Sequence, residues 1–170
     1  MDQPVITTLD GTKLDVVKDF QHLGAWISST KHDIEIRRPR AWKVLHSMKK
    51  VWQSSMQDDL KRRLFVATVE SVLTYGCEAW TLSVRDEKAL DGVYTRMLRV
   101  ALNVSWEDHI TNVNLYGKLP RLCDKIRQRR MRLAGHCVRH PELSACEFIF
   151  ILWEPKHSQR SKGRPKQPML

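Results

Sequence analysis

The sequence predicts a mainly α fold in which a short N-terminal β-hairpin precedes a helical bundle and a basic C-terminal helix and tail. Three observations carry this prediction. Apolar residues recur at three- and four-residue spacing over most of residues 33–134, as amphipathic helices require. A turn signal flanked by β-forming residues occurs only near the N-terminus. Residues 155–170 are rich in Lys, Ser, Gln, Gly and Pro, which cannot bury a core.

Composition limits the classes of protein to which the chain can belong. Its 170 residues suffice for one domain with a real core, and 42% hydrophobic content argues against wholesale disorder. The longest apolar run, residues 148–153, is far too short to span a bilayer, and no signal-peptide pattern follows Met1. We therefore expect an intracellular protein with no membrane partner and with its four cysteines reduced.

The net charge of +10 is concentrated in the last third of the chain. Residues 1–120 contain 17 basic and 15 acidic residues, whereas residues 121–170 contain 12 basic and 4 acidic residues. A concentrated basic segment suits a polyanion, most often nucleic acid. The alternative is a solvated helix face with a flexible tail, and the charge count alone does not separate the two.

The N-terminal region is predicted to form hairpins. Val5–Leu9 is rich in β-formers, Asp10-Gly11 is a strong turn signal, and Thr12–Val17 can return as the partner strand. The segment from Phe20 to Ile27 follows, and its Gly24 allows a sharp bend or close approach of the backbone to a phosphate.

The first two helices are expected over residues 33–51 and from Asp58-Asp59 to Gly76. Pro39 lies within the first, so that helix is expected either to restart at Pro39 or to kink. The second should bury a stripe of six apolar side chains, namely Leu60, Leu64, Phe65, Val69, Val72 and Leu73.

A third helix is expected to begin at Ser83, with Asp86 completing a capping box. Its apolar positions are Leu90, Val93, Tyr94, Met97, Leu98, Ala101 and Leu102. A short helical piece is expected over residues 111–117. A last helix should start at Pro120, with a narrower apolar stripe of Leu119, Leu122, Ile126, Met131, Leu133 and Ala134.

Two constellations could suggest metal chemistry. Asp58 and Asp59 are adjacent, but two-metal catalysis needs carboxylates that converge on a strand turn, whereas this pair opens a helical pattern. No other carboxylate set replaces it, so we expect no enzyme activity from this chain alone. Cys123, His136, Cys137 and His140 are zinc candidates without C-x₂-C or C-x₄-H spacing; we expect no cofactor and prefer helix-end and packing roles.

Guanidinium groups pair bidentately with phosphate oxygens, so the arginines of the last helix are the main candidates for nucleic-acid contacts. Lys61 and Arg62 form a second basic cluster at a helix start, and Trp26 is the tryptophan proposed for base stacking. In the tail, Arg164 lies within a Ser-Lys-Gly-Arg-Pro sequence that resembles the core of an AT-hook. The arginines are Arg127, Arg129, Arg130, Arg132 and Arg139.

Four short motifs, in this order, resemble the region downstream of the catalytic palm in reverse transcriptases of LINE-type (non-LTR) retrotransposons. They are Phe20-x-x-Leu23-Gly24, Tyr75-Gly76-x-Glu78-x-Trp80, Arg96-Met97-Leu98-Arg99 and Gly135-His136-x-x-Arg139. The resemblance covers about residues 18–165. It implies a primer-grip role for Phe20, Leu23 and Gly24, and a helical thumb-like domain after them.

The resemblance implies four regions. Residues 1–30 would be the end of a palm with a primer-grip-like hairpin, and residues 31–118 a helical thumb-like domain. Residues 119–153 would form a basic helix and C-terminal segment, and residues 154–170 a disordered basic tail. The implied function is to grip an RNA–DNA hybrid or DNA duplex in the nucleus, beside the palm and fingers of a parent RNA-directed DNA polymerase.

A different class of function stays open on the sequence alone. The chain could be a co-opted helical interaction module without nucleic-acid activity, or a decayed fragment whose N-terminal hairpin exposes an unpaired sheet edge. The position of Pro39 fits the decayed fragment.

Overall fold

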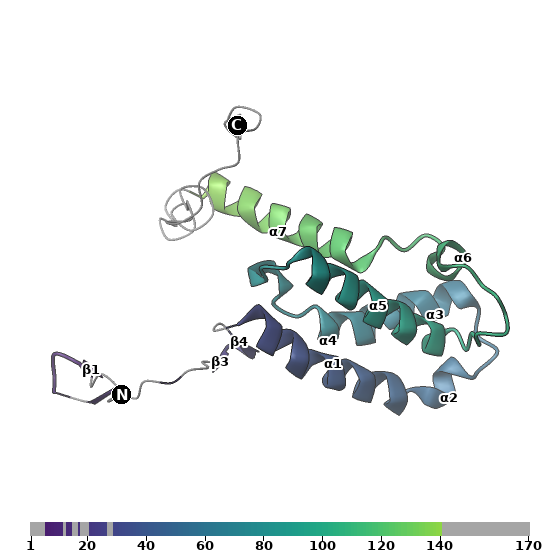
Figure 1. The fold of residues 1–170 in the computed structure, drawn as a ribbon, viewed down its shortest axis with the longest axis horizontal. Helices are drawn as coiled ribbons and strands as arrows, with labels where there is room; N and C mark the ends of the chain where they lie inside the picture. The colour runs from purple at the N-terminus through teal and green to yellow at the C-terminus, as the bar shows by residue number, and fades with distance from the viewer. Residues whose placement is uncertain (1–5, 12, 15–16, 18–20, 27–28, 141–170) are drawn as a thin grey trace. The chain divides into compact units, whose positions relative to one another are not determined.

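A computed structural model describes residues 6–11, 13–14, 17, 21–26 and 29–140. It divides the chain into two units, residues 1–130 and 131–170. The elements are mostly helices, preceded by two short hairpins (Figure 1), so the predicted fold class is confirmed. The predicted disordered tail, Phe20 and Arg164 lie outside the described residues.

Both hairpins are short and antiparallel. In the first, β1 (Ile6–Thr7) pairs with β2 (Lys13–Leu14), as predicted, but the turn is displaced: the Gly11 amide donates to Thr8 O, which makes Leu9 and Asp10 the central residues. In the second, β3 (Gln21–His22) pairs with β4 (Ala25–Trp26). Its two turn residues, Leu23 and Gly24, have φ of 47° and 82°, as a type I′ turn requires.

The first long helix, α1 (Thr30–Ser47), begins at Ser29, whose hydroxyl accepts from the His32 amide. It runs through Pro39 without restarting, and after Met48 the short α2 (Lys49–Trp52) follows. Pro39 is exposed, on the side of α1 away from the core. The carbonyl of Glu35 loses its helical donor at Pro39 and can therefore be hydrated. Of the two expected alternatives, the restart at Pro39 is excluded, because α1 is one continuous helix.

The second predicted helix has three parts: α3 (Asp58–Phe65), a π-helical turn η1 (Val66–Glu70) and α4 (Ser71–Leu73). The wide π turn lets two consecutive residues, Val69 and Glu70, face inward. Before this turn, the buried face of α3 is shifted by one residue from the predicted stripe: Lys61 is buried, whereas Leu60 is 51% exposed. The prediction that Leu60 is buried is therefore wrong.

The amphipathic helix α5 (Val84–Ala101) matches its prediction. Ser83 and Asp86 form the predicted capping box, and all seven predicted apolar positions are buried. A 3₁₀ turn, η2 (Cys77–Ala79), precedes it, and α6 (Asn112–Tyr116) follows, capped by Thr111. The last helix, α7 (Leu122–Arg139), continues through Gly135, and Met131 is 61% exposed, contrary to prediction.

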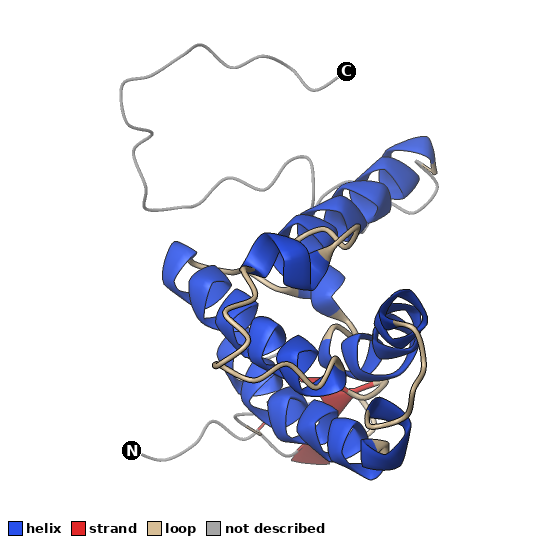
Figure 2. Cartoon of the chain, turned by 90° about the vertical axis from the view of Figure 1, so that its right-hand side faces the viewer, coloured by secondary structure: helices blue, strands red, loops and turns tan. Residues whose placement is uncertain are grey.

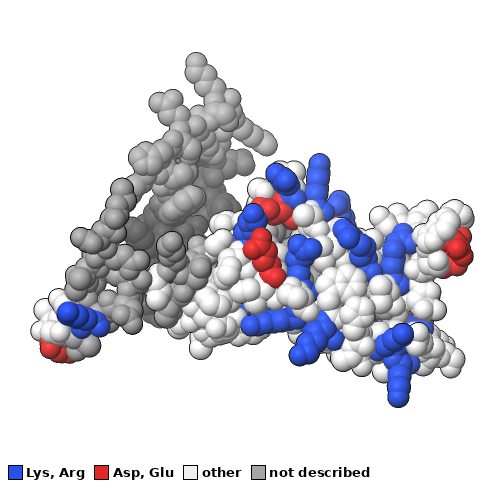
Figure 3. All heavy atoms as spheres, turned by 60° about the horizontal axis from the view of Figure 1, so that its bottom comes forward, with Lys and Arg blue, Asp and Glu red and all other residues white. Residues whose placement is uncertain are grey.

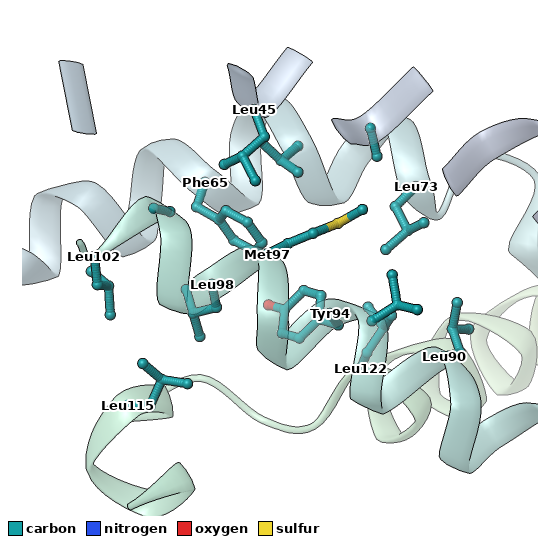
Figure 4. Packing of buried hydrophobic residues seen from close by; sticks show 14 of the residues in the cluster. Leu45, Phe65, Leu73, Leu90, Tyr94, Met97, Leu98, Leu102, Leu115 and Leu122 are labelled. Carbon is teal, nitrogen blue, oxygen red and sulfur yellow. The ribbon is translucent and has the colours of Figure 1, made fainter. Parts of the chain in front are cut away.

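The core lies where α5 packs against α1, the α3–η1–α4 segment and the first turns of α7. Side chains of α5 occupy its centre: Met97 lies between Leu45, Phe65 and Leu73, and Tyr94 lies next to Met97 on the side away from Leu45 (Figure 4). The rings of Phe65 and Tyr94 meet edge to face, with centroids 5.3 Å apart. Helices α3 and α6 thus pack against α5, and α1 packs against η1 and α4 (Figures 1 and 2).

Replacing Pro39 by Ala should stabilise the protein, because it restores a backbone donor on α1 and removes a clash inside the helix. A proline in a helix interior costs about 3 kcal/mol, and its rigidity in the unfolded chain recovers about 1 kcal/mol. We expect the free energy of unfolding in urea to rise by about 1–2 kcal/mol. Arg40→Ala, at an exposed site of the same helix, should change it by less than about 0.5 kcal/mol; equal effects of both substitutions would contradict this account.

Candidate nucleic-acid interface

A buried carboxylate holds the second hairpin on the helical body. Asp33, on the first turn of α1, is 1% exposed. Its Oδ2 accepts from Arg37 Nε and from Trp80 Nε1, each at 2.8 Å, and its Oδ1 accepts from the Trp26 backbone amide at 3.3 Å. One side chain therefore joins β4, α1 and the segment that follows η2.

The turn of that hairpin is held from two further directions. Arg37 Nη2 donates to Gly24 O at 3.0 Å, and the Tyr75 hydroxyl donates to Leu23 O at 2.8 Å. The Arg37 guanidinium also lies 4.9 Å from the centroid of the Tyr75 ring, within cation–π range. Both carbonyls of the turn are therefore bonded to the helical body.

The motif Tyr75-Gly76-x-Glu78-x-Trp80 has a structural explanation in these contacts. Gly76 has φ of 71°, and a Cβ there would lie 3.3 Å from the Cβ of Ala25, so both its conformation and the space favour glycine. Glu78 forms an ion pair with Arg129 of α7 at 3.0 Å. Tyr75, Gly76, Glu78 and Trp80 thus form the joint between the hairpin, α1 and α7.

Two of the three predicted primer-grip residues, Leu23 and Gly24, lie at this joint, and the third, Phe20, is outside the described residues. Leu23 is 79% exposed at the tip of the turn, and Gly24 follows it. Trp26 is half-buried, with its ring edge to face on His32 at a centroid distance of 4.9 Å. Its indole Nε1 is buried without a hydrogen-bond partner. The Leu23-Gly24 turn, like the neighbouring strand β3, is therefore exposed, whereas Trp26 is only partly so.

Two of the five α7 arginines predicted to contact phosphate form ion pairs with described residues. Arg127 binds Glu87 at 2.6 Å and Asp124 at 3.1 Å, although its side chain is still 58% exposed. Arg129 binds Glu78, and its Nη1 donates to Thr74 Oγ1 at 2.8 Å. For Arg130, Arg132 and Arg139 the described part of the chain provides no ion-pair partner.

The second predicted cluster, at the start of α3, faces the protein. Lys61 is 6% exposed. Arg62 donates to the carbonyls of Leu115 and Asn114 and forms an ion pair with Asp59 at 2.9 Å. Asp58 and Asp59 are the first residues of α3, as predicted for helix-start residues. This placement gives Arg62 a structural role in fixing α6 against α3.

A set of unpaired cations lies instead on the solvent side of α1 and α2. We name it the α1–α2 basic face; all its members are exposed, and none forms an ion pair with a described residue. Trp42 and His46 lie on the same side with their rings stacked, 5.5 Å between centroids. Figure 3 shows Lys and Arg spread over the helical body with few acids among them. The members are Arg38, Arg40, Lys43, Lys49 and Lys50.

The sequence contains a signal for this face that the charge count of residues 1–120 conceals. Residues 36–56 contain no Asp or Glu. Of their cations, Arg37 alone is buried. A count over residues 1–120 averages this stretch with acids that lie elsewhere in the fold, so a window of one helix is needed to detect it.

The zinc candidates do not assemble. Among the residues that the structure describes, no three His, Cys, Asp or Glu side chains lie together as metal ligands. Cys123 Sγ donates to Glu87 O at 3.4 Å, and the rings of His136 and His140 lie 4.4 Å apart. Burial, aided by Asp91, raises the pKa of the Cys123 thiol to about 12, which opposes the thiolate that zinc requires.

Comparison with known proteins gives one informative relative. Over 162 residues the chain is 26% identical to an uncharacterized transposon-derived protein of Caenorhabditis elegans, F52C9.6, and the match covers 90% of this chain and 58% of that protein. The chain thus spans little more than half the length of this relative. No family profile and no solved structure matches the chain. No described helix is long and apolar enough to cross a membrane.

The Asp33 network predicts a large loss of stability in Asp33→Asn. The substitution removes one charge of a buried pair and leaves Arg37, 4% exposed, without its counter-ion. Breaking such a pair costs about 3–5 kcal/mol. Chemical denaturation should show this loss, whereas Glu35→Gln, at an exposed position two residues further along the same helix, should change the free energy of unfolding by less than about 0.5 kcal/mol. Similar stability of the two variants would refute the role assigned to Asp33.

The thiols of Cys77 and Cys123 should react slowly in the folded protein. Burial raises the pKa of Cys77 to about 11, with a further contribution from Glu78, and that of Cys123 to about 12. At pH 8 roughly one Cys77 thiol in a thousand is then ionised, and the fraction increases with pH. Mass spectrometry after iodoacetamide treatment should show modification mainly in urea. Rapid labelling of either residue in the native protein at pH 8 would contradict this.

Proposed function

We propose that this chain is the non-catalytic, nucleic-acid-gripping C-terminal part of an RNA-directed DNA polymerase of a LINE-type retrotransposon. It would bind a primer–template, such as an RNA–DNA hybrid, in the nucleus through phosphate contacts. The observation that carries the proposal is the α1–α2 basic face, whose five cations have no ion-pair partner among the described residues. The similarity to a transposon-derived protein supports the same origin.

The basic face has dimensions that suit a nucleic-acid backbone. From Arg38 to Lys50 the chain advances about 18 Å at a rise of 1.5 Å per residue. A duplex strand advances about 3.4 Å per nucleotide, so this length corresponds to about five phosphates. Lys and Arg contacts to phosphates position a duplex without reading its bases. We therefore propose binding with little sequence preference.

In this proposal, nucleotide addition takes place on the palm of the parent polymerase and not on this chain. Asp58 and Asp59 open helix α3, and Asp59 is paired with Arg62, so we assign neither of them to metal binding. The joint around Asp33 would hold the primer-grip-like turn at a fixed place beside α1. The chain's own contribution would be to position the duplex for an active site on the palm.

The test is the salt dependence of duplex binding. Fluorescence anisotropy with a labelled RNA–DNA hybrid and with duplex DNA, at two salt concentrations, gives the slope of log K against log salt. In a triple variant with Arg40, Lys43 and Lys50 replaced by Gln, the loss of three phosphate contacts should reduce the slope by about 2.7. We expect affinity to fall at least tenfold at the lower salt concentration.

The matched control removes the same charge from α7. Arg130, Arg132 and Arg139 replaced by Gln should leave most of the slope in place. If this control loses the slope and the α1–α2 variant keeps it, the interface lies on α7, as the sequence alone suggested. Binding that is absent or insensitive to salt would refute the proposed function and favour a helical interaction module.

A further inference from the structure

At one end of the basic face the surface is hollowed by a cavity of about 470 Å³. It lies between α2 and the C-terminal end of α5, where the 42%-exposed Val100 and the half-buried Val104 supply apolar surface to it. Leu45 and Trp52 lie beneath this surface, 0% and 2% exposed, and the Trp52 indole N–H donates to Leu45 O at 2.8 Å, so Trp52 offers no free donor. The cavity therefore combines a hydrophobic lining with the end of a cationic surface.

Three cationic or titratable side chains line the same cavity: His46, Lys49 and Arg99. Lys49 forms no ion pair with a described residue. Arg99 uses Nη2 to hold Ile110 O at 2.8 Å and Asn112 Oδ1 at 3.1 Å, and no described residue accepts from its Nε or Nη1. No Asp or Glu is among the lining residues, so an anion placed here would meet no like charge from a side chain.

The two ends of the cavity differ in the group they suit. The C-terminal end of α5 carries the negative pole of its helix dipole, which opposes a phosphate close to Asn103. Lys49 and His46, on α2 and α1, suit the phosphate better. A planar apolar group would then pack on Val100 and Val104, where the Asn103 amide supplies polar groups for a base edge.

We propose that this cavity binds one nucleoside monophosphate unit, with the phosphate at Lys49 and His46 and the base on the apolar lining. The volume lies within the usual range for small-molecule sites, about 300–1,000 Å³. The inference rests on the proposed function for the source of that unit, which is an unpaired nucleotide of the bound strand. A free nucleotide has the same chemistry, and the experiments below separate the two.

The first experiment uses dAMP and amide chemical shifts of the full chain. Titration should move the amides of Lys49, Val100 and Asn103. Val100→Trp, at a 42%-exposed lining residue, should fill the cavity and weaken binding at least tenfold. Val84→Trp, the same substitution at a 69%-exposed residue outside the lining, should bind dAMP like the unmodified chain. Shifts that appear elsewhere, or equal binding by both variants, would overturn the proposal.

Two smaller probes test whether both halves of the ligand are needed. Inorganic phosphate alone and deoxyadenosine alone should each bind at least tenfold more weakly than dAMP. Phosphate that binds as tightly as dAMP would show that the site selects only for an anion, and would overturn the assignment of a nucleoside.

The second experiment compares a blunt RNA–DNA hybrid with the same hybrid whose DNA strand carries one unpaired deoxyadenosine nucleotide at its 3′ end. The overhang should tighten binding by the unmodified chain and by Val84→Trp but not by Val100→Trp. If dAMP binds in the cavity and the overhang gives no gain, the source is a free nucleotide and the strand assignment is wrong. Val100→Trp should bind the blunt duplex as tightly as the unmodified chain does. If the unmodified chain binds dAMP but no blunt duplex, the proposed function alone is overturned.

Discussion

The Asp33 carboxylate is the contact on which the arrangement of the N-terminal half depends. A buried carboxylate is expensive unless its oxygens are paired, and here the partners come from three separate segments: Trp26, Arg37 and Trp80. Any displacement of the second hairpin or of the segment after η2 would leave part of that charge unpaired. The network therefore specifies one docking geometry, even though ion pairs of this kind contribute little net stability over apolar packing.

A second set of buried acids does the same for α7. Glu70, on the π turn, accepts from the Tyr94 hydroxyl and from Lys125 Nζ, each at 2.6 Å. Asp91 accepts from the Cys123 amide at the start of α7. Burial and the neighbouring Glu70 carboxylate raise the pKa of Tyr94 above its ordinary value, so its hydroxyl stays a donor at alkaline as well as neutral pH. Positive charge in the first turns of α7, such as that of Lys125, therefore holds this helix against the core.

The structure shows which features local sequence determines. Helix α5 was predictable because its capping box and apolar stripe involve residues three or four apart. The burial of Lys61 beside an exposed Leu60 was not, since a π turn follows and nothing in residues 66–70 announces it. The ion pairs of Arg127 with Glu87 and of Arg129 with Glu78 join residues that are 40 and 51 positions apart in the sequence. The net charge of a sequence segment does not distinguish these paired cations from those of the α1–α2 basic face, which form no ion pair with a described residue.

Helix α1 connects the two surfaces of the proposed interface through adjacent residues, one buried and one exposed. Arg37 is buried and bonds to Gly24 of the hairpin turn, whereas Arg38 is exposed on the basic face. Because one continuous helix carries both, a strand held by the basic face would lie at a set distance from the Leu23-Gly24 turn. In the proposed role, the same helix would then both hold the duplex and position the primer. The position of Pro39 fits this, since an exposed proline in the middle of α1 interrupts its backbone bonds on the solvent side and leaves the buried side intact.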